Sequence, residues 1–276
     1  MKRKIIVFAL GIALCTSSAT FATGDPQGND ALVAKTNQSL VATDVVKVEN
    51  KVMTQLPEAY KSLIPELEEG AQLIFDNAEY TGSMVNNIPN GMGSLKFSYS
   101  YTDDLGTKYK VNCQATGEFK DYFLNGQGEF IIDYKMDSIH NDTRKYKGNF
   151  HYGLINGSGT HIYITYNGSG STFFEETYEG NFKFGQMNGN FKVTTKHNEA
   201  LYPNTNLIVE TGIYKNSKKD NHWIKKEFNK SGNLVSFIEG QYEEGFKIGR
   251  WMGQDSYGNS IGSEYTPVYD FTREIK

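Results

Sequence analysis

Five histidines, the adjacent glutamates Glu175 and Glu176 and one glycine–serine loop are the parts of this sequence whose residue types suggest chemistry. No two histidines have the His-x-x-x-His spacing that brings two imidazoles to one metal; they are His140, His151, His161, His197 and His222. His151 and His161 fall within one short segment and could meet across a hairpin, but ordinary surface histidines are the simpler interpretation. The histidine pattern predicts no metal and no cofactor.

The paired carboxylates Glu175 and Glu176 could in principle act as an acid and a base. Adjacent residues of a strand point to opposite faces, however, so an exposed charge pair is the better interpretation. The stretch "NGSGSTFF" from Asn167 has the composition of a phosphate loop but lacks its lysine and following helix, which favours a turn between strands. No nucleophile elbow is present in the sequence, and we expect a non-enzymatic protein.

The cysteines are Cys15 and Cys113. Cys113 lies in "VNCQATGEF", where Val111, Cys113 and Ala115 alternate onto one face of a strand. This pattern predicts a small buried side chain, and a reactive or intermolecular thiol is the alternative. Since Cys15 falls in the leader described below, no internal disulfide is expected.

The one basic cluster is "KNSKKDNHWIKK", residues 215–226. It could attract an acidic partner or a lipid head group. A solvated hairpin rim is the preferred interpretation, because the acids Glu227, Glu243 and Glu244 follow.

The elements that position all of these residues are internal repeats. Four segments align, "YTGSMVNNIPNGMG" from Tyr80, "ATGEFKDYFLNGQG" from Ala115, "YKGNFHYGLINGSG" from Tyr146 and "YEGNFKFGQMNGNF" from Tyr178. Looser copies start at residues 210 and 238, so that successive starts are 28 to 35 residues apart. The shared pattern is an aromatic residue, Gly third, an aromatic residue or Met fifth, often Gly eighth, Asn-Gly at eleven and twelve, and Gly at fourteen.

Positions one, three and five share one face of a strand, and the glycines of the returning half share a face as well. We therefore expect each copy to be a β-hairpin in which large rings lie over bare glycine backbone. The Asn-Gly pair and the eighth glycine suit turn residues with positive φ. On this interpretation Gly157→Val destabilises the protein by overpacking, at a cost of ~1–3 kcal/mol or more.

This pattern resembles the MORN (membrane occupation and recognition nexus) repeat family, whose motif is Tyr-x-Gly-x-Phe/Trp, a central Gly, then Gly-x-Gly. The copy at Tyr178 departs from it at Phe191, and the last two copies close on Gly-x-Trp-like endings at Trp223 and Trp251. The resemblance implies a mainly β protein, an elongated single-layer sheet of successive hairpins, and a role in protein interaction or association near membranes. The repeat positions expected to carry the architecture are Tyr80, Gly82, Gly91, Gly93, Gly117, Phe119, Gly126, Gly128, Tyr146, Gly148, Phe150, Gly157, Gly159, Tyr178, Gly180, Phe182, Gly189, Trp223, Gly249 and Trp251.

The six hairpins are expected over residues 80–262, between two other segments. Residues 51–79 include Tyr60, Leu63, Ile64 and Leu67 at helical spacing, which predicts a short helical cap interrupted at Pro65. Residues 23–50 are polar and without pattern, which predicts a flexible spacer. The tail, residues 263–276, could pair as a closing strand or fray.

The first 22 residues have the order of a secretory signal peptide: Lys2, Arg3 and Lys4, then an apolar run too short for a membrane span, then small residues. Lipid attachment at Cys15 is the weaker alternative, because Leu14 stands where a small residue is needed. Cleavage removes three of 28 basic residues and none of 32 acidic ones, which shifts the net charge from −4 to −7. The sequence therefore predicts an exported protein that does not bind nucleic acid.

Three functions follow from these features, in order of preference. The first is a scaffold or adaptor at the cell envelope that binds a protein partner, with a membrane surface as a weaker alternative because of the negative charge. The second is a glycan- or cell-wall-binding module, in which exposed Tyr and Trp rings such as Trp223 and Trp251 stack on sugars. The third, an enzyme, is supported by no set of residues.

Overall fold

The computed structural model describes residues 46–53, 74–75, 78–102, 106–136, 139–198 and 207–265. Nearly all of these residues are in β-strands, and none is in a helix. The strands are β1 (Val46–Met53), β2 (Ile74–Phe75), β3 (Ala78–Val85), β4 (Ile88–Thr102), β5 (Lys108–Lys120), β6 (Phe123–Met136), β7 (Ile139–His151), β8 (Leu154–Tyr166), β9 (Thr172–Lys183), β10 (Gln186–His197), β11 (Leu207–Lys215), β12 (Lys218–Phe228), β13 (Leu234–Glu243), β14 (Phe246–Asp255) and β15 (Ser260–Tyr265).

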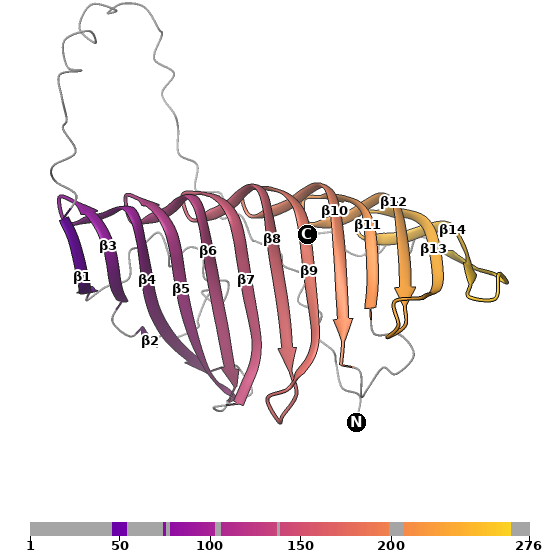
Figure 1. Ribbon diagram of the computed structural model, residues 1–276, viewed down its shortest axis with the longest axis horizontal. Helices are drawn as coiled ribbons and strands as arrows, with labels where there is room; N and C mark the ends of the chain where they lie inside the picture. Colours follow the sequence, from indigo (N-terminus) through magenta and orange to yellow (C-terminus); the bar gives the residue numbers. More distant parts are fainter. Residues whose placement is uncertain are drawn as a thin grey trace, which may run out of the picture. The chain divides into compact units, whose positions relative to one another are not determined.

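The strands form one sheet in which neighbours in the sequence are neighbours in space. The order runs from β1 to β3 and then without interruption to β15, while β2 pairs with the far part of β4. Figure 1 shows this succession, with strands following one another across the sheet in chain order and curving over at one end. The six predicted hairpins are β3–β4, β5–β6, β7–β8, β9–β10, β11–β12 and β13–β14, so the predicted fold class is confirmed.

The two ends of the predicted helical cap are strands. Met53 ends β1, and β2 and the start of β3 fall within residues 74–79. The positions at helical spacing, from Tyr60 to Leu67, lie outside the described residues. The spacer prediction also ends too late, because β1 begins at Val46. Val46, Val48 and Val52 alternate with polar residues over most of this segment, a strand signal that the spacer interpretation overlooked.

Each hairpin closes through a two-residue turn in which both residues have positive φ, the type I′ geometry that suits the twist of antiparallel strands. Three of the turns use the eighth-position glycine of the repeat, as predicted: Gly153, Gly185 and Gly245. The other three turns have non-glycine residues at both positions, as in Asn86–Asn87.

The Asn-Gly pair does not form the turn, contrary to the sequence-based prediction. Its asparagine instead reaches the turn of the next hairpin, where Asn156 Oδ1 accepts a hydrogen bond from the backbone N–H of Phe184 at 3.1 Å. Asn125 makes the equivalent contact to Tyr152 at 3.4 Å. A backbone bond accompanies it, since Gly185 N–H donates to the carbonyl of Ile155 at 2.8 Å. Each hairpin therefore holds the tip of the following one.

The glycine of the Asn-Gly pair lies at a β-bulge in the returning strand. Between the pairs Gly148–Gly159 and Phe150–Ile155, one residue of β7 faces three residues of β8. Gly157 has φ +94°, and a Cβ built on it would be 3.8 Å from Asn149, an ordinary contact distance. The predicted overpacking at Gly157 is therefore wrong. A side chain there is disfavoured because its backbone conformation is one that L-residues rarely adopt.

The large-against-small packing is confirmed at four hairpins. In β3–β4 the ring of Tyr80 covers Gly93. In the last three hairpins the ring has moved to the returning strand and the glycine to the first strand, so that Phe191 covers Gly180, Trp223 covers Gly212 and Trp251 covers Gly240. The last three copies thus keep the packing of a ring over a glycine, but the two residues have exchanged strands. This is possible because either strand can supply the ring.

In the second and third hairpins an aliphatic side chain takes the place of the ring. A Cβ on Gly159 would be 2.6 Å from Ile155 Cδ1, and one on Gly128 would be 2.9 Å from Leu124 Cδ2. The first-position Tyr146 and Tyr178 pack at the margin of the core instead. The prediction that rings cover every glycine slot is therefore too general, because a branched aliphatic chain fills the same space.

A ladder of edge-to-face aromatic contacts runs through the last strands to the end of the described chain. Ring centroids 5.1–6.3 Å apart link successive residues, in the geometry that aromatic quadrupoles prefer. The first residues of the tail, 263–265, pair as part of a closing strand, because Ser260–Tyr265 forms β15 beside β14 and Tyr265 completes the ladder. The rest of the tail, residues 266–276, lies outside the described residues. The members are Phe182, Phe191, Tyr214, Trp223, Tyr242, Trp251 and Tyr265.

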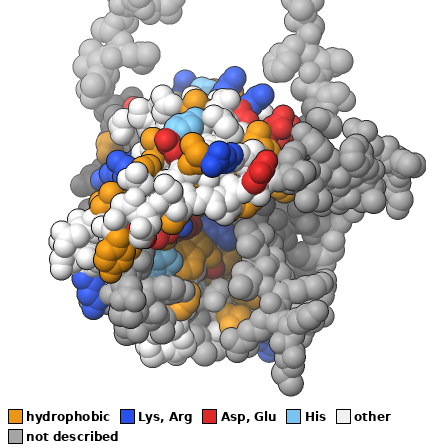
Figure 2. All heavy atoms as spheres, turned by 90° about the vertical axis from the view of Figure 1, so that its right-hand side faces the viewer, with side chains coloured by type: hydrophobic (Ala, Val, Ile, Leu, Met, Phe, Trp, Pro, Cys, Tyr) orange, Lys and Arg blue, Asp and Glu red, His pale blue; other side chains and the backbone are white. Residues whose placement is uncertain are grey.

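The surface seen from the right-hand side of Figure 1 carries positive, negative and hydrophobic side chains side by side (Figure 2). No helix within the described ranges is long and apolar enough to cross a membrane.

Candidate partner-binding face

One face of the sheet, called here the inner face, carries side chains in rows that cross the strands. Residues directly opposite in an antiparallel pair point to the same side, so the register defines each row. The middle row is Phe97, Cys113, Ile132, Arg144, Tyr163, Glu176, Thr195, Ile208, Glu227 and Ser236. The row on its hairpin-turn side is Leu95, Ala115, Phe130, Tyr146, His161, Tyr178, Val193, Glu210, Lys225 and Ile238.

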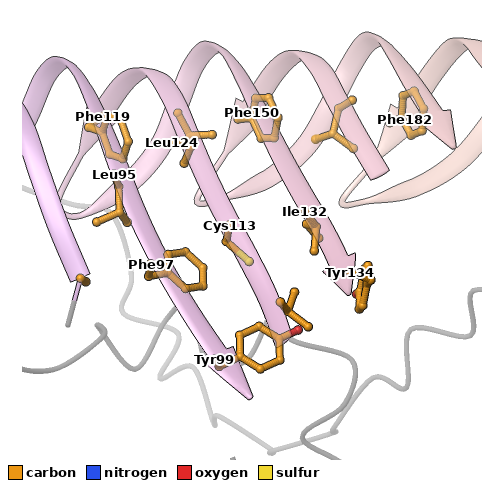
Figure 3. Packing of buried hydrophobic residues seen from close by; sticks show 14 of the residues in the cluster. Leu95, Phe97, Tyr99, Cys113, Phe119, Leu124, Ile132, Tyr134, Phe150 and Phe182 are labelled. Atoms are coloured by element: carbon orange, nitrogen blue, oxygen red, sulfur yellow. The ribbon is translucent and has the colours of Figure 1, made fainter. Parts of the chain in front are cut away.

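Over β4 to β6 these rows are apolar, and all their members except the partly buried Phe130 are closed to solvent. Leu95, Phe97, Cys113, Ala115 and Ile132 are all at most 7% exposed. Figure 3 shows several of them side by side along the strands, with Tyr99 and Tyr134 at the far end. This part of the inner face is a core, and it confirms the prediction that Cys113 is a small buried side chain.

From β7 onward the same rows become polar. Arg144, His161, Glu176, Glu210 and Lys225 occupy positions that are apolar in the earlier strands, and all are half-buried. The backbone pairing continues unchanged through this switch. Inner-face side chains of β7 to β12 are called the polar half below. Polar groups concentrated on part of a continuous face, where packing alone would favour apolar residues, make the polar half the candidate site.

His161 lies between two tyrosines in the polar half. Its ring stacks on Tyr146 with centroids 4.3 Å apart and an interplanar angle of 4°, and on Tyr178 at 5.5 Å and 18°. Its Nε2 atom is buried without a hydrogen-bond partner. Burial, and then the positive charge of Arg144, lower the pKa of His161 to about 3. The ring is thus a neutral, flat part of the stack at ordinary pH.

Glu176 lies on β9 two residues before Tyr178 of this stack, and hydroxyl groups hold its carboxylate. Tyr178 Oη donates to one carboxylate oxygen at 2.8 Å, and Thr195 Oγ1 donates to the other at 3.3 Å. Burial, followed by the charge of Glu176, raises the pKa of Tyr178, so its hydroxyl remains a donor. Glu175, its neighbour in the chain, bonds instead to Lys196 at 3.4 Å. The predicted division of these two carboxylates between opposite faces is confirmed.

The acids of the next strands are neutralised by lysines of the predicted basic cluster. Lys219 Nζ lies 2.7 Å from Glu210 Oε1, and Lys225 Nζ lies 2.6 Å from Glu227 Oε1. Lys218 at the hairpin turn pairs with Glu244 at 3.7 Å. The hairpin-rim interpretation of residues 215–226 is confirmed for the turn. Two of its lysines, however, belong to the inner face, because strand alternation carries every second residue there.

The other residues with suggested chemistry are separated by the fold. His151 is exposed beside the third hairpin turn and pairs with Leu154, whereas His161 pairs with Tyr146 farther along the strands, so the two histidines do not meet. The surface-histidine prediction is wrong for His161. The loop from Asn167 connects β8 and β9 as a turn, which is closed by backbone N–H groups of Ser169 and Ser171 donating to Asn167 Oδ1.

The two tryptophans suggested as sugar platforms are not available for stacking. Trp223 and Trp251 are each 1% exposed, because they fill the glycine slots of Gly212 and Gly240. Trp223 Nε1 donates to the backbone carbonyls of Ile213 and Asp220, at 3.1 Å each. The prediction that these rings present a sugar-binding surface is wrong.

Some of the predicted repeat positions, such as Tyr80, Gly93 and Trp223, take part in the ring-on-glycine packing, whereas the polar half contains residues that the motif does not specify. Among the described residues, no group of three or more His, Cys, Asp or Glu side chains is placed to hold a metal. Arg144, Tyr163, Glu176 and Thr195 follow the fourteenth position of the repeat or precede its first, where the motif is silent. Counting polar residues at every second position in the parts of the strands that lie outside the motif could have found these four residues.

Comparison with known families agrees with the hairpin assignment. The MORN repeat model matches residues 80–98, 116–132, 146–168 and 178–190, which fall on the first four hairpins. A search of the curated proteins gives no match. MORN repeats suggest a repeat-based module for protein interaction. Four consecutive hairpins of this sheet, β3–β4 to β9–β10, therefore carry MORN repeats.

Proposed function

We propose that this protein is an exported, non-catalytic scaffold that binds a partner protein along the polar half of its inner face. The observation that carries this proposal is the switch within the rows, from an apolar core over β4 to β6 to rows over β7 to β12 in which most side chains are half-buried and charged or aromatic, with Val193 and Thr195 buried among them. A face that served only to stabilise the sheet would be expected to stay apolar along its length.

The chemistry of the polar half suits a polypeptide partner. It offers tyrosine rings, two lysine–glutamate pairs and several hydroxyl groups. Tyr and Arg are enriched where proteins meet, because they combine apolar area with hydrogen bonding.

Export is the second part of this proposal, and it rests on the basic, apolar and small-residue order of residues 1–22. Cell fractionation with mass spectrometry of the N-terminus tests it. The expected product begins after Ala22 or Ala19 and is found outside the cytoplasm, at the envelope or in the medium. Retention of the intact leader in the cytoplasmic fraction would contradict export.

Site-specific photocrosslinking in intact cells tests the binding face. A benzophenone amino acid at Ile208 lies in the middle row of the inner face, and the same group at Val209 lies on the opposite face of the same strand. We expect one discrete crosslinked protein from position 208 and none, or a different one, from 209. Equal crosslinking from both positions would refute the assignment of the face.

A further inference from the structure

We infer that Glu176 and the aromatic side chains around it form a subsite for an organic cation, namely a lysine or arginine side chain of the partner. The identity of this occupant depends on the function proposed above. The site itself depends only on the contacts of the described residues.

The first observation is that Glu176 lacks a cationic partner. Its hydrogen bonds come from Tyr178 and Thr195, two neutral hydroxyl groups, and no ion pair joins it to a Lys, Arg or His of the described ranges. In the same two rows, Glu210 and Glu227 each have a lysine within 2.7 Å. Glu176 therefore departs from the pattern of its neighbours.

A half-buried carboxylate without a cation is costly unless a ligand supplies the charge. A carboxylate has about four acceptor positions, and two hydroxyl donors leave about half of them open. A bound ammonium or guanidinium group would complete this set with charge-assisted hydrogen bonds, which are the stronger kind.

The second observation is the aromatic surroundings of this carboxylate. Tyr163 lies directly across from Glu176 on β8, and Phe174 and Tyr178 flank it on β9. The rings of Tyr163 and Phe174 meet edge to face at 5.8 Å. Aromatic faces attract organic cations, and their edges and faces also pack against the apolar shaft of Lys or Arg.

This combination selects an organic cation over a metal ion. Ca²⁺ takes six to eight oxygen ligands and Mg²⁺ about six, whereas Glu176 is one carboxylate among rings. The acidic balance of the chain, −4 overall, favours approach of a basic partner. A free amine has the same chemistry as a lysine side chain, and the experiment must separate these two sources.

The test uses the full chain in its exported form, with N-acetyl-lysinamide and N-acetyl-argininamide as probes and neutral N-acetyl-norleucinamide as control. We expect saturable shifts of the backbone amide signals of Tyr163, Glu176 and Thr195 with the charged probes only, weakening as salt rises. Glu176→Gln, which keeps oxygen and shape, should bind the probes at least tenfold more weakly. Glu175→Gln is the matched control on the opposite face and should bind as the wild type does.

Unchanged affinity in Glu176→Gln, or equal shifts with norleucinamide, would overturn the subsite. Since the salt dependence is measured on the wild type, the inference remains testable even if the variant does not fold. The partner crosslinked through Ile208 then separates the sources. Loss of that crosslink in Glu176→Gln supports a side chain of the partner, whereas probe binding lost with the crosslink retained assigns the subsite to a free amine. A crosslink without any probe binding overturns the subsite and leaves the scaffold proposal standing.

Discussion

Gly212→Ala is the most direct test of the packing that builds this sheet. A Cβ on Gly212 would lie inside contact distance of three atoms of the Trp223 indole, and no real Cβ approaches a neighbour so closely. The indole cannot withdraw easily, because it is 1% exposed and its Nε1 donates to two carbonyls at 3.1 Å. Overpacking of a closed core by one methyl group costs about 1–3 kcal/mol.

For a domain of this size, such a loss lowers the melting temperature by about 2 to 12 °C. Two other glycines separate the contributions. Gly189 has φ +103° and nothing within 4 Å of a built Cβ, so Gly189→Ala measures backbone strain alone, at about 1–2 kcal/mol. Gly168 has neither a close neighbour nor a positive φ, so Gly168→Ala should change stability by less than about 0.5 kcal/mol.

Equilibrium unfolding in urea, followed by far-ultraviolet circular dichroism, measures all three variants. The decisive comparison adds Trp223→Leu, which removes the indole that the new methyl group would strike. If the contact is real, Gly212→Ala should cost less in the Trp223→Leu background, with a coupling of about 0.5–3 kcal/mol. A Gly212→Ala protein as stable as the Gly168→Ala control, or strictly additive costs in the double variant, would refute the ring-on-glycine packing.

Three further predictions concern the hairpin tips and the stacked histidine. Asn156→Ala removes the acceptor of the Phe184 N–H, and we expect urea unfolding to show a loss of about 1 kcal/mol, whereas no loss would mean that hairpins are not joined there. Phe184 is 55% exposed with φ 47°, so Phe184→Asn, which suits that conformation, should leave the melting temperature equal or higher, and a clear fall would show that the ring stabilises the tip. His161 has its pKa lowered to about 3, below the usual ~6.5, so the unfolded chain binds more protons and stability falls by up to ~1.4 kcal/mol per pH unit below about 6.5. Melting temperatures at pH 7 and 5.5 should show that fall in the wild type and a smaller one in His161→Phe, and identical pH profiles would contradict burial of this ring.

The spacing of glycines and aromatic residues was sufficient to predict the hairpins, because each large residue needs a bare backbone opposite it. It could not show which strand supplies the large residue. Phe191 and Trp223 looked like departures from the motif, yet each fills the slot of a glycine on the partner strand. Asn156 was misassigned for a related reason. Asn-Gly is a strong local turn signal, but here the two-residue turn is Tyr152–Gly153, and the asparagine serves the neighbouring hairpin through a contact 28 residues away.

The polar half could not be recognised from the repeat because its residues owe their proximity to register across strands. Tyr163, Glu176 and Thr195 are 13 and 19 residues apart in sequence, and they become adjacent only when β8, β9 and β10 pair. An alternation of polar and apolar residues predicts that one face differs from the other. It does not say which positions of successive strands will be level, since the bulge in each hairpin shifts the pairing.

The separation of the motif positions from the row positions explains how one repeat can make both a core and the proposed binding face. Glycine slots and two-residue tip turns occur in all six hairpins, and a backbone hydrogen bond joins each hairpin to the tip of the next, so these features fix the spacing of the hairpins. Row positions outside the motif can differ in type without altering that spacing. The paired residues Ile132 of β6 and Arg144 of β7, for example, stand in the same row although one is apolar and the other charged. A substitution at a motif position should therefore lower the stability of the protein in whichever hairpin it is made. A substitution at Tyr163 or Glu176 should instead change binding, with little effect on the fold. Glu176→Lys should reverse the charge preference of the subsite without disturbing the glycine–aromatic packing, and measured stability together with probe binding would distinguish the two effects.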